Sequence, residues 1–220
     1  MLYKIAHFLR DRMPWLWDLI DIVNSMLFHI RFGKRLESIE HGICYKGNLN
    51  EIFPEEYYVL PMRDVKTDEL VGFFARQPDE AYRFFKPHGF DRKSIKKLQR
   101  NRSFLGYVLK DVANGKIVGY CFNRSFFHGK GFRGRMVDVG YRGKGLGTMM
   151  NRFLNKVGFG IGLRLFETVS KDNVASYRSV ISAGSFKVME ELPHNELYLE
   201  IINNMNLDSK IIQNGGVKPG

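Results

Sequence analysis

The residues best suited to chemistry form a glycine-rich run at Arg142–Gly147, with the sequence RGKGLG. Alternating glycines allow successive backbone N–H groups to point into one small concavity. A helical pattern begins near Gly147, and the N-terminus of a helix adds unpaired N–H groups and a positive electrostatic potential. Arg142 and Lys144 place two cations beside it. The run therefore predicts a cradle for a phosphate or pyrophosphate group.

Two common phosphate-binding motifs do not fit this run. The Walker motif requires Ser or Thr after its lysine, whereas Lys144 is followed by Gly145. The dinucleotide fingerprint requires an early βαβ unit and an acidic residue about twenty positions later. An ordinary surface turn is the remaining alternative, but turns rarely need three glycines and two cations in front of a helix. A phosphate loop of another kind is expected.

The chain has 220 residues, of which 44% are hydrophobic. This length suits one catalytic domain with an appendage, and it is short for two full domains. The cysteines, Cys44 and Cys121, lie far apart in the sequence and belong to no CxxC pair or histidine cluster. They indicate neither a disulfide framework nor a zinc site, and no metal is implied. A cytoplasmic location is expected.

The chain is basic, with a formal net charge of +11. Much of the excess lies between Asp91 and Met136, which includes the segment RKSIKKLQRNR. The positive electrostatic potential of such a segment attracts polyanions: nucleic acid, an anionic membrane surface, or a small ligand with several phosphates. Charge alone leaves these three partners open.

Residues 1–50 form a predicted helical appendage that is rich in Leu, Ile, Phe and Trp. Charged residues interrupt the apolar pattern too often for a signal peptide or a membrane span. Pro14 is predicted to begin a second amphipathic helix and Gly33 to end it. One interpretation is a peripheral membrane anchor, and the favoured one is a face that packs on the catalytic domain or on a second subunit. The side chains concerned are Phe8, Trp15, Leu16 and Trp17.

Residues 51–203 show the pattern of one domain, and the tail 204–220 is expected to be mobile. A strand is predicted at Tyr57–Met62, followed by two helical segments and then by another helix from Asp91, whose side chain could cap it. Asn114-Gly115 predicts the turn of a β-hairpin. The full predicted order is β, α, α, β, β, β, α, β, α, β, β, an α/β (α+β) arrangement with a mixed sheet and helices on both faces.

The RGKGLG run matches R/Q-x-x-G-x-G/A, follows the strand MVDV and precedes a helix. In this it resembles the acetyl-coenzyme A (acetyl-CoA) loop of the GNAT superfamily of N-acetyltransferases. Downstream, ETVSKDNVASYRSVISAGSF is similar to the family's strand, asparagine and helix, here with Ser185 inserted between Gly184 and Phe186. The likeness covers roughly Tyr57 to Ile201. It implies a GNAT-like, mostly antiparallel sheet and acetyl-CoA as cosubstrate.

The resemblance also implies how the cosubstrate is held. The strand that ends near Val139 would part from the strand LRLFETV, and the pantetheine arm would lie along the exposed strand edge. The N–H near Val139 would face the thioester carbonyl and stabilise the oxyanion. Holding the amine and the thioester in line would supply much of the catalysis. The implied binding residues are Val137, Val139, Arg142, Gly143, Lys144, Gly145, Leu146, Gly147 and Asn173.

Proton transfer is less well defined by the sequence. Many family members carry a tyrosine acid seven residues after the asparagine, a position held here by Val180. Candidate bases are His88, Glu167 and Asp138, in that order. Each has a structural alternative: a loop residue that caps a helix for His88, an ion pair at a strand end for Glu167, and a paired surface carboxylate for Asp138.

The acceptor is expected to contact Asp64–Arg102, where aromatic residues alternate with a dense cluster of cations. This mixture favours a small amine with a stacking surface and its own phosphates, such as a nucleotide-linked amino sugar. Pro87-His88 resembles a feature of the GNAT subset in surface-polysaccharide pathways. Alternatives are an RNA-binding module, a protein N-acetyltransferase, and an inactive scaffold bound to a membrane or partner. Nucleic acid is not the expected partner, and monomer and homodimer stay open.

Overall fold

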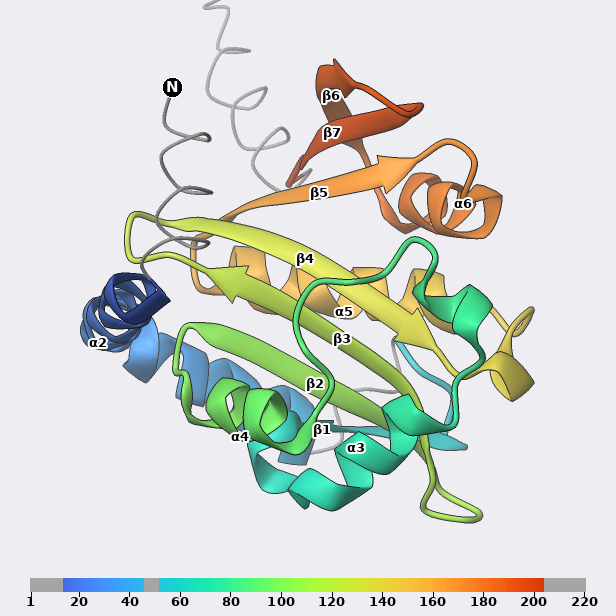
Figure 1. The fold of residues 1–220 in the computed structure, drawn as a ribbon, viewed down its shortest axis with the longest axis horizontal. Helices are drawn as coiled ribbons and strands as arrows, with labels where there is room; N and C mark the ends of the chain where they lie inside the picture. The colour runs from blue at the N-terminus through green and yellow to red at the C-terminus, as the bar shows by residue number, and fades with distance from the viewer. Residues whose placement is uncertain (1–13, 46–51, 204–220) are drawn as a thin grey trace, which may run out of the picture.

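The computed structural model describes residues 14–45 and 52–203 (Figure 1). A single seven-stranded sheet has the order β1-β2-β3-β4-β5-β7-β6. Neighbouring strands are antiparallel except β4 and β5, which are parallel. The predicted mixed, mostly antiparallel sheet is confirmed. The strands are β1 (Tyr57–Pro61), β2 (Phe104–Asp111), β3 (Ile117–Ser125), β4 (Lys130–Val137), β5 (Arg164–Ser170), β6 (Phe186–Leu192) and β7 (Glu196–Ile201).

Helices cover both faces of this sheet, as predicted. Figure 1 shows α3 and α4 in front of the sheet and α5 behind it. Apolar side chains of α2, α5 and α6 join one buried cluster, and those of α3 and α4 join another. The α-helices are α2 (Pro14–Glu40), α3 (Thr67–Ala75), α4 (Arg92–Arg100), α5 (Leu146–Gly160) and α6 (Val174–Ala183), with short helical turns at His41–Tyr45, Met62–Asp64, Asp79–Tyr82 and Val139–Tyr141.

Local signals in the sequence set several of these boundaries. Asp91 accepts hydrogen bonds from the N–H groups of Lys93 and Ser94, so it caps α4 as predicted. Gly115 turns the β2–β3 hairpin with φ +67°, a left-handed conformation that glycine adopts without strain. These positions depend on neighbours in the chain, which is why the sequence predicts them.

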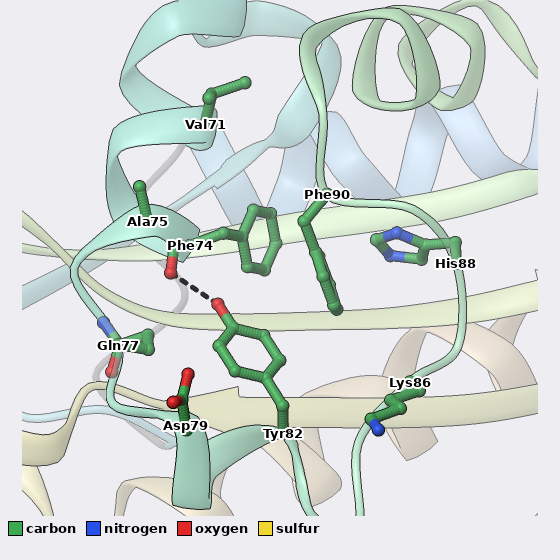
Figure 2. A pocket seen from close by; sticks show the side chains of 9 residues that line it. All are labelled: Val71, Phe74, Ala75, Gln77, Asp79, Tyr82, Lys86, His88 and Phe90. Carbon is green, nitrogen blue, oxygen red and sulfur yellow. Dashed lines mark hydrogen bonds between the residues drawn. The ribbon is translucent and has the colours of Figure 1, made fainter.

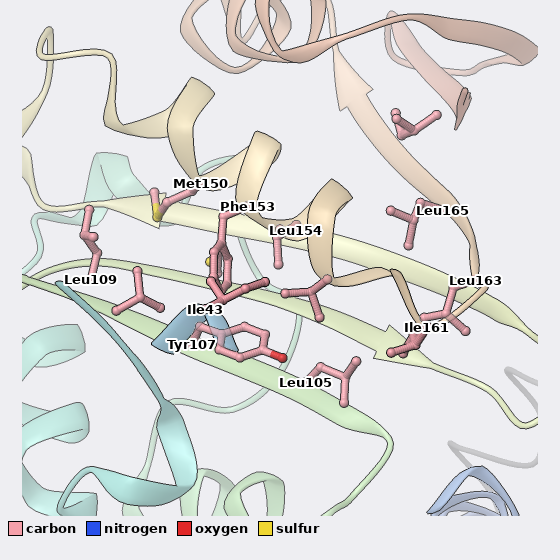
Figure 3. Close-up of a cluster of buried hydrophobic side chains, with 14 of the residues drawn as sticks. Ile43, Leu105, Tyr107, Leu109, Met150, Phe153, Leu154, Ile161, Leu163 and Leu165 are labelled. Carbon is pink, nitrogen blue, oxygen red and sulfur yellow. The ribbon is translucent and has the colours of Figure 1, made fainter. Parts of the chain in front are cut away.

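The core on the α5 face joins α2 to the sheet. Figure 3 shows Phe153 of α5 above Tyr107 of β2, with their ring centroids 4.9 Å apart in an edge-to-face arrangement. The Tyr107 hydroxyl donates to Glu40 Oε1 at 2.8 Å, and Arg63 forms an ion pair with the same buried carboxylate. The C-terminal end of α2 is therefore fixed by both apolar packing and a buried polar network.

The prediction that Gly33 ends the N-terminal helix is wrong, because α2 continues to Glu40. Phe32 and Leu36 are buried in the core on either side of Gly33. Their packing outweighs the cost of about 1 kcal/mol for a glycine inside a helix. A Cβ at position 33 would lie 2.5 Å from Nδ1 of His29, so any larger residue here would displace the His29 side chain.

Pro14 is the first residue of α2, as predicted. Leu16 and Trp17 are partly buried. The predicted helix before Pro14, the side chains of Phe8 and Trp15, and the tail 204–220 lie outside what the structure describes. Within residues 14–45 and 52–203, no helix has both the length and the hydropathy needed to cross a bilayer.

Candidate active site

The glycine-rich run turns the chain from the end of β4 into α5. Gly143 and Gly145 have φ values of +79° and +76°, which other residues adopt only with strain. Gly145 is the N-cap of α5, and Leu146 is buried in the core and anchors the first turn of the helix. The predicted turn at a helix N-terminus is confirmed. It presents backbone N–H groups and the positive end of α5 to one place, which suits a phosphate.

Strands β4 and β5 separate midway along β4, before the chain reaches this loop. Their pairing covers Lys130–Phe132 and Arg164–Phe166 only. On the other side of β4, the Asp138 N–H donates to the Val118 carbonyl at 2.9 Å. Because N–H directions alternate along a strand, the Val137 N–H points toward the edge that β5 has left. The predicted separation of the two strands is confirmed, and it exposes the edge of β4.

A cleft of about 970 Å³ follows this separation. One end is formed by the glycine loop and the first turn of α6, and the other by the segment 84–87 with Phe122, Arg124 and Phe132. The volume is at the upper end of the range for small-molecule sites. Arg133 belongs to the lining, and its Nη2 is buried without a partner among the described residues. The left-handed glycines and the open strand edge are the features that fit acetyl-CoA.

Three buried charges link the two strands where they part. Glu167 of β5 accepts from Nε of Arg133 and from Nη1 of Arg135, each at 2.5 Å. Arg135 also donates to the carbonyl and hydroxyl oxygens of Ser176 in α6, both at 3.0 Å. Arg133 reaches Asn155 of α5. This charge cluster, Arg133–Glu167–Arg135, ties β4, β5, α5 and α6 together beside the cleft.

The cluster keeps its carboxylate ionised. Burial alone would raise the pKa of Glu167, but the charges of Arg135 and Arg133 and their hydrogen bonds outweigh it, and the pKa lies below its usual range. Burial lowers the pKa of Arg133. Sequence reasoning selected Glu167 and missed both arginines. Their alternation in GFRGRMV, opposite an acid at an apolar position of the next strand, is the signal that could have revealed them.

Asp138 lies beside the cleft and does not line it. Its carboxylate accepts from Nε of Arg76 and from Nε2 of Gln77, both at 3.0 Å, and from the Gly140 N–H. Although burial would raise the pKa of Asp138, these hydrogen bonds lower it. Gln77 also accepts the Val139 N–H at 3.2 Å. The amide predicted to face the thioester therefore has a side-chain partner here, whereas the Val137 amide lies on the open edge.

His88 lies in a different pocket, of about 510 Å³, between α3 and the segment 79–90 (Figure 2). Its Nδ1–H donates to the Gly89 carbonyl at 2.9 Å, so Nε2 accepts from the hydroxyl of Tyr120 at 2.9 Å. Tyr120 is fully buried. Burial lowers the pKa of His88, which favours the neutral ring. The three predicted bases are thus not brought together, and only Glu167 of the three lines the cleft.

The other predicted binding residues lie around the cleft. Asn173 lines it and is the N-cap of α6, with Oδ1 accepting from the Ser176 N–H at 3.2 Å. Arg142 and Lys144 are exposed on the loop, and Lys144 Nζ lies 4.8 Å from the centre of the Tyr141 ring. Among the described residues, no group of three or more His, Cys, Asp or Glu side chains is placed to hold a metal.

This geometry agrees with a family comparison. Residues 37–179 match the model of the Acetyltransferase (GNAT) family. The chain belongs to that family and is an acyl-CoA-dependent acetyltransferase, with acetyl-CoA as its cosubstrate. No curated protein matches the sequence significantly.

Solved structures share the fold at low sequence identity. The ribosomal-protein-S5-alanine acetyltransferase from Vibrio fischeri is 16% identical with a TM-score of 0.53, over 68% of this chain and 94% of that one. The GNAT domain of S. lividans PAT is 15% identical with a TM-score of 0.57, over 66% and 89%. The aminoglycoside acetyltransferase AAC(6')-Ib, in complex with coenzyme A and kanamycin, is 15% identical with a TM-score of 0.51, over 70% and 99%.

Proposed function

We propose that the protein moves an acetyl group from acetyl-CoA directly to a primary amine, and that the acceptor is a nucleotide-linked amino sugar or a similar small phosphorylated amine. The observation that carries the proposal is the cleft between β4 and β5. Its loop end offers glycine N–H groups and cations, and its far end combines aromatic rings with further cations. One end suits the phosphates of the cosubstrate, and the other suits a stacking, anionic acceptor.

The far end of the cleft supports the acceptor class. Phe132 lines it and is partly exposed, and its ring lies nearly parallel to that of Phe166 with centroids 5.7 Å apart. Tyr198 continues this ladder of rings at 5.5 Å from Phe166. Lys86 and Arg124 line the same end. A planar base can extend the ladder at Phe132 while Lys86 attracts a diphosphate; Arg124, which already pairs with Asp21, adds a further hydrogen-bond donor. The AAC(6')-Ib complex with kanamycin supports an aminoglycoside-like amine as an acceptor for this fold.

The chemistry of the two cysteines supports direct transfer. Burial raises the pKa of Cys44 to about 12, and it raises the pKa of Cys121 further. Neither thiol ionises at neutral pH, so neither is a good nucleophile for an acyl-enzyme route. Both are free, which supports a reducing, cytoplasmic location.

The chain's own residues have distinct roles in this proposal. The Val137 N–H, on the open edge of β4, stabilises the negative charge that develops on the thioester oxygen. The loop glycines and Asn173 hold the cosubstrate, and Arg142 and Lys144 add positive potential near its phosphates. Glu80, an exposed carboxylate in the lining, attracts the acceptor's ammonium group.

Glu167 is the predicted base that best fits a role in the site, and we assign it to positioning. Its low pKa makes it a weak base, so its main effect is to fix Arg133 and Arg135 along the cleft. His88 and Asp138 already have partners outside the cleft lining. The ammonium group therefore loses one proton to solvent before it attacks, and kcat/KM rises with pH toward the pKa of the amine. The C–N bond then forms as the C–S bond of the thioester breaks, and the departing coenzyme A thiolate takes up the second proton that the nitrogen releases.

The first test compares two glycine variants. Gly143→Ala and Gly115→Ala each place a side chain at a left-handed position with open space around it, so both carry a similar backbone strain of about 1–2 kcal/mol. Only Gly143 belongs to the cleft lining. We expect acetyl-CoA to raise the unfolding temperature of the wild type and of Gly115→Ala, and Gly143→Ala to lose most of that shift. Equal shifts in both variants would refute the loop assignment.

The acceptor is then tested by release of free thiol. A nucleoside-diphosphate-linked amino sugar is compared with the same amino sugar lacking the nucleotide. The proposal expects a much larger kcat/KM for the linked sugar and a selective loss of that preference in Phe132→Leu. Equal activity toward both sugars would remove the nucleotide from the proposal and leave the acetyltransferase assignment intact.

A further inference from the structure

The outer face of α2 is apolar and exposed. Ile22, Met26 and Ile30 are 57%, 61% and 79% exposed, and they recur at the spacing of one helical face. Leu19, Ile20, Val23 and Leu27 extend the same exposed surface. Single exposed apolar residues are ordinary, but a continuous patch over three turns marks an interaction surface.

The opposite face of α2 already serves the protein core. Phe28, Phe32 and Leu36 are buried there, and Asn24 hydrogen-bonds to Ser103 and to the Ser125 carbonyl. A helix that only covers a core needs one apolar face. The second apolar face therefore has no role within the described residues, and it lies on a helix that packing holds firmly.

Charges around this face are arranged for an anionic partner. The two acidic residues of α2 near the apolar face form ion pairs with the rest of the protein: Asp18 pairs with Lys97, and Asp21 pairs with Arg124 at 3.2 Å. Immediately after Ile30 come three exposed cations, Arg31, Lys34 and Arg35, followed by the exposed acid Glu37. The seven apolar side chains thus lie beside a basic rim. Residues 1–13, outside the described part, add by sequence three cations and one acid.

Phe127 widens the apolar face beyond the helix. Its side chain is exposed, and its backbone is tied to α2 on both sides: its N–H donates to Oδ1 of Asn24 at 3.0 Å, and its carbonyl accepts from Nη1 of Arg31 at 2.9 Å. An aromatic ring held beside an apolar helix and a basic rim is suited to a membrane interface.

We propose that α2 lies in the plane of an anionic lipid bilayer, with Leu19–Ile30 in the interface and Arg31, Lys34 and Arg35 on the headgroups. No described helix is long and apolar enough to span the bilayer, so the contact is peripheral. A second copy of the chain fits less well, because symmetry would bring the same basic rim to the interface while Asp18 and Asp21 are already paired. This inference is independent of the acceptor.

The test is sedimentation of the full chain with vesicles of phosphatidylcholine, with and without phosphatidylglycerol. The key pair is Ile22→Glu and Val112→Glu, because these side chains are 57% and 56% exposed and Val112 lies in the β2–β3 hairpin. We expect binding to the anionic vesicles only, a loss of at least about tenfold in Ile22→Glu, and no change in Val112→Glu. Lys34→Gln is expected to weaken binding and Lys116→Gln, in the hairpin, to leave it unchanged.

Several results would overturn the inference. Absence of binding by the wild type, equal binding by Ile22→Glu, or equal binding to neutral and anionic vesicles would each contradict it. Sedimentation velocity without lipid tests whether a second copy of the chain occupies this face instead. A wild-type dimer that Ile22→Glu converts to a monomer, together with no binding to vesicles, would assign the face to a second copy. Acetyl-CoA binding by Ile22→Glu shows that the variant is folded.

Discussion

Replacing Glu167 with glutamine tests whether the buried charge cluster supports the site or supplies a base. The substitution preserves shape and removes one negative charge between two arginines. The side chains of Arg133 and Arg135 are only 1% and 6% exposed. Breaking a buried ion pair on one side costs about 3–5 kcal/mol, because the remaining charge is left without compensation. That is a large part of a typical folding free energy of about 5–15 kcal/mol.

The expected loss is measurable by urea unfolding followed by circular dichroism. With an m-value of about 3 kcal/mol/M, the midpoint of Glu167→Gln falls by about 1–2 M. Glu191→Gln is the matched control, since Glu191 is exposed and pairs with Lys171 at 3.5 Å, a contact of about 1 kcal/mol or less. The double variant Arg133→Gln/Glu167→Gln is expected to lose less than the sum of the two single losses, because it removes both charges of one pair.

The pH dependence has a definite sign. The pKa of Glu167 is lower in the folded protein than its usual value of 4.5. The stability from ionised Glu167 is therefore fully present above pH 4.5 and is lost as the pH falls through the folded pKa. The difference between the wild type and Glu167→Gln should narrow below pH 4.5. A variant that matches Glu191→Gln in stability but has lost kcat would refute this reasoning and make Glu167 a catalytic base.

The remaining predictions concern His88 and Tyr107. Burial lowers the pKa of His88 below 6.5 in the folded protein, so the wild type loses stability as the pH falls below 6.5. The His88→Gln variant should lose less stability over the same pH interval and should keep the wild-type pH profile of kcat/KM. A changed pH profile in the variant would instead identify His88 as a base. Tyr107→Phe removes the hydroxyl that donates to buried Glu40. We expect the free energy of unfolding, measured in urea, to fall by about 1.5–3 kcal/mol while the affinity for acetyl-CoA stays the same. An unchanged unfolding midpoint would show that this hydrogen bond does not hold α2 in place.

Local features of this protein could be predicted from the sequence because the physics that decides them is local. Left-handed backbone at Gly143 and Gly145 follows from steric limits on every other residue. The cap at Asp91 and the hairpin at Gly115 depend on groups within a few residues. Such local signals, together with the predicted order of helices and strands, were enough to predict the fold class and the glycine loop of the site.

Tertiary structure decided what depends on distant residues. Gly33 remains helical because Phe32 and Leu36 pack into a core that the local pattern does not contain. Glu167 contacts Arg133 and Arg135 only because β5 lies beside β4. The Val139 N–H is not available to a ligand, because it donates to Gln77 of another segment. His88 faces Tyr120 and not the cleft. Sequence limits which groups a chain can offer, and packing between distant segments determines which of them meet, because side-chain contacts act over only a few ångströms.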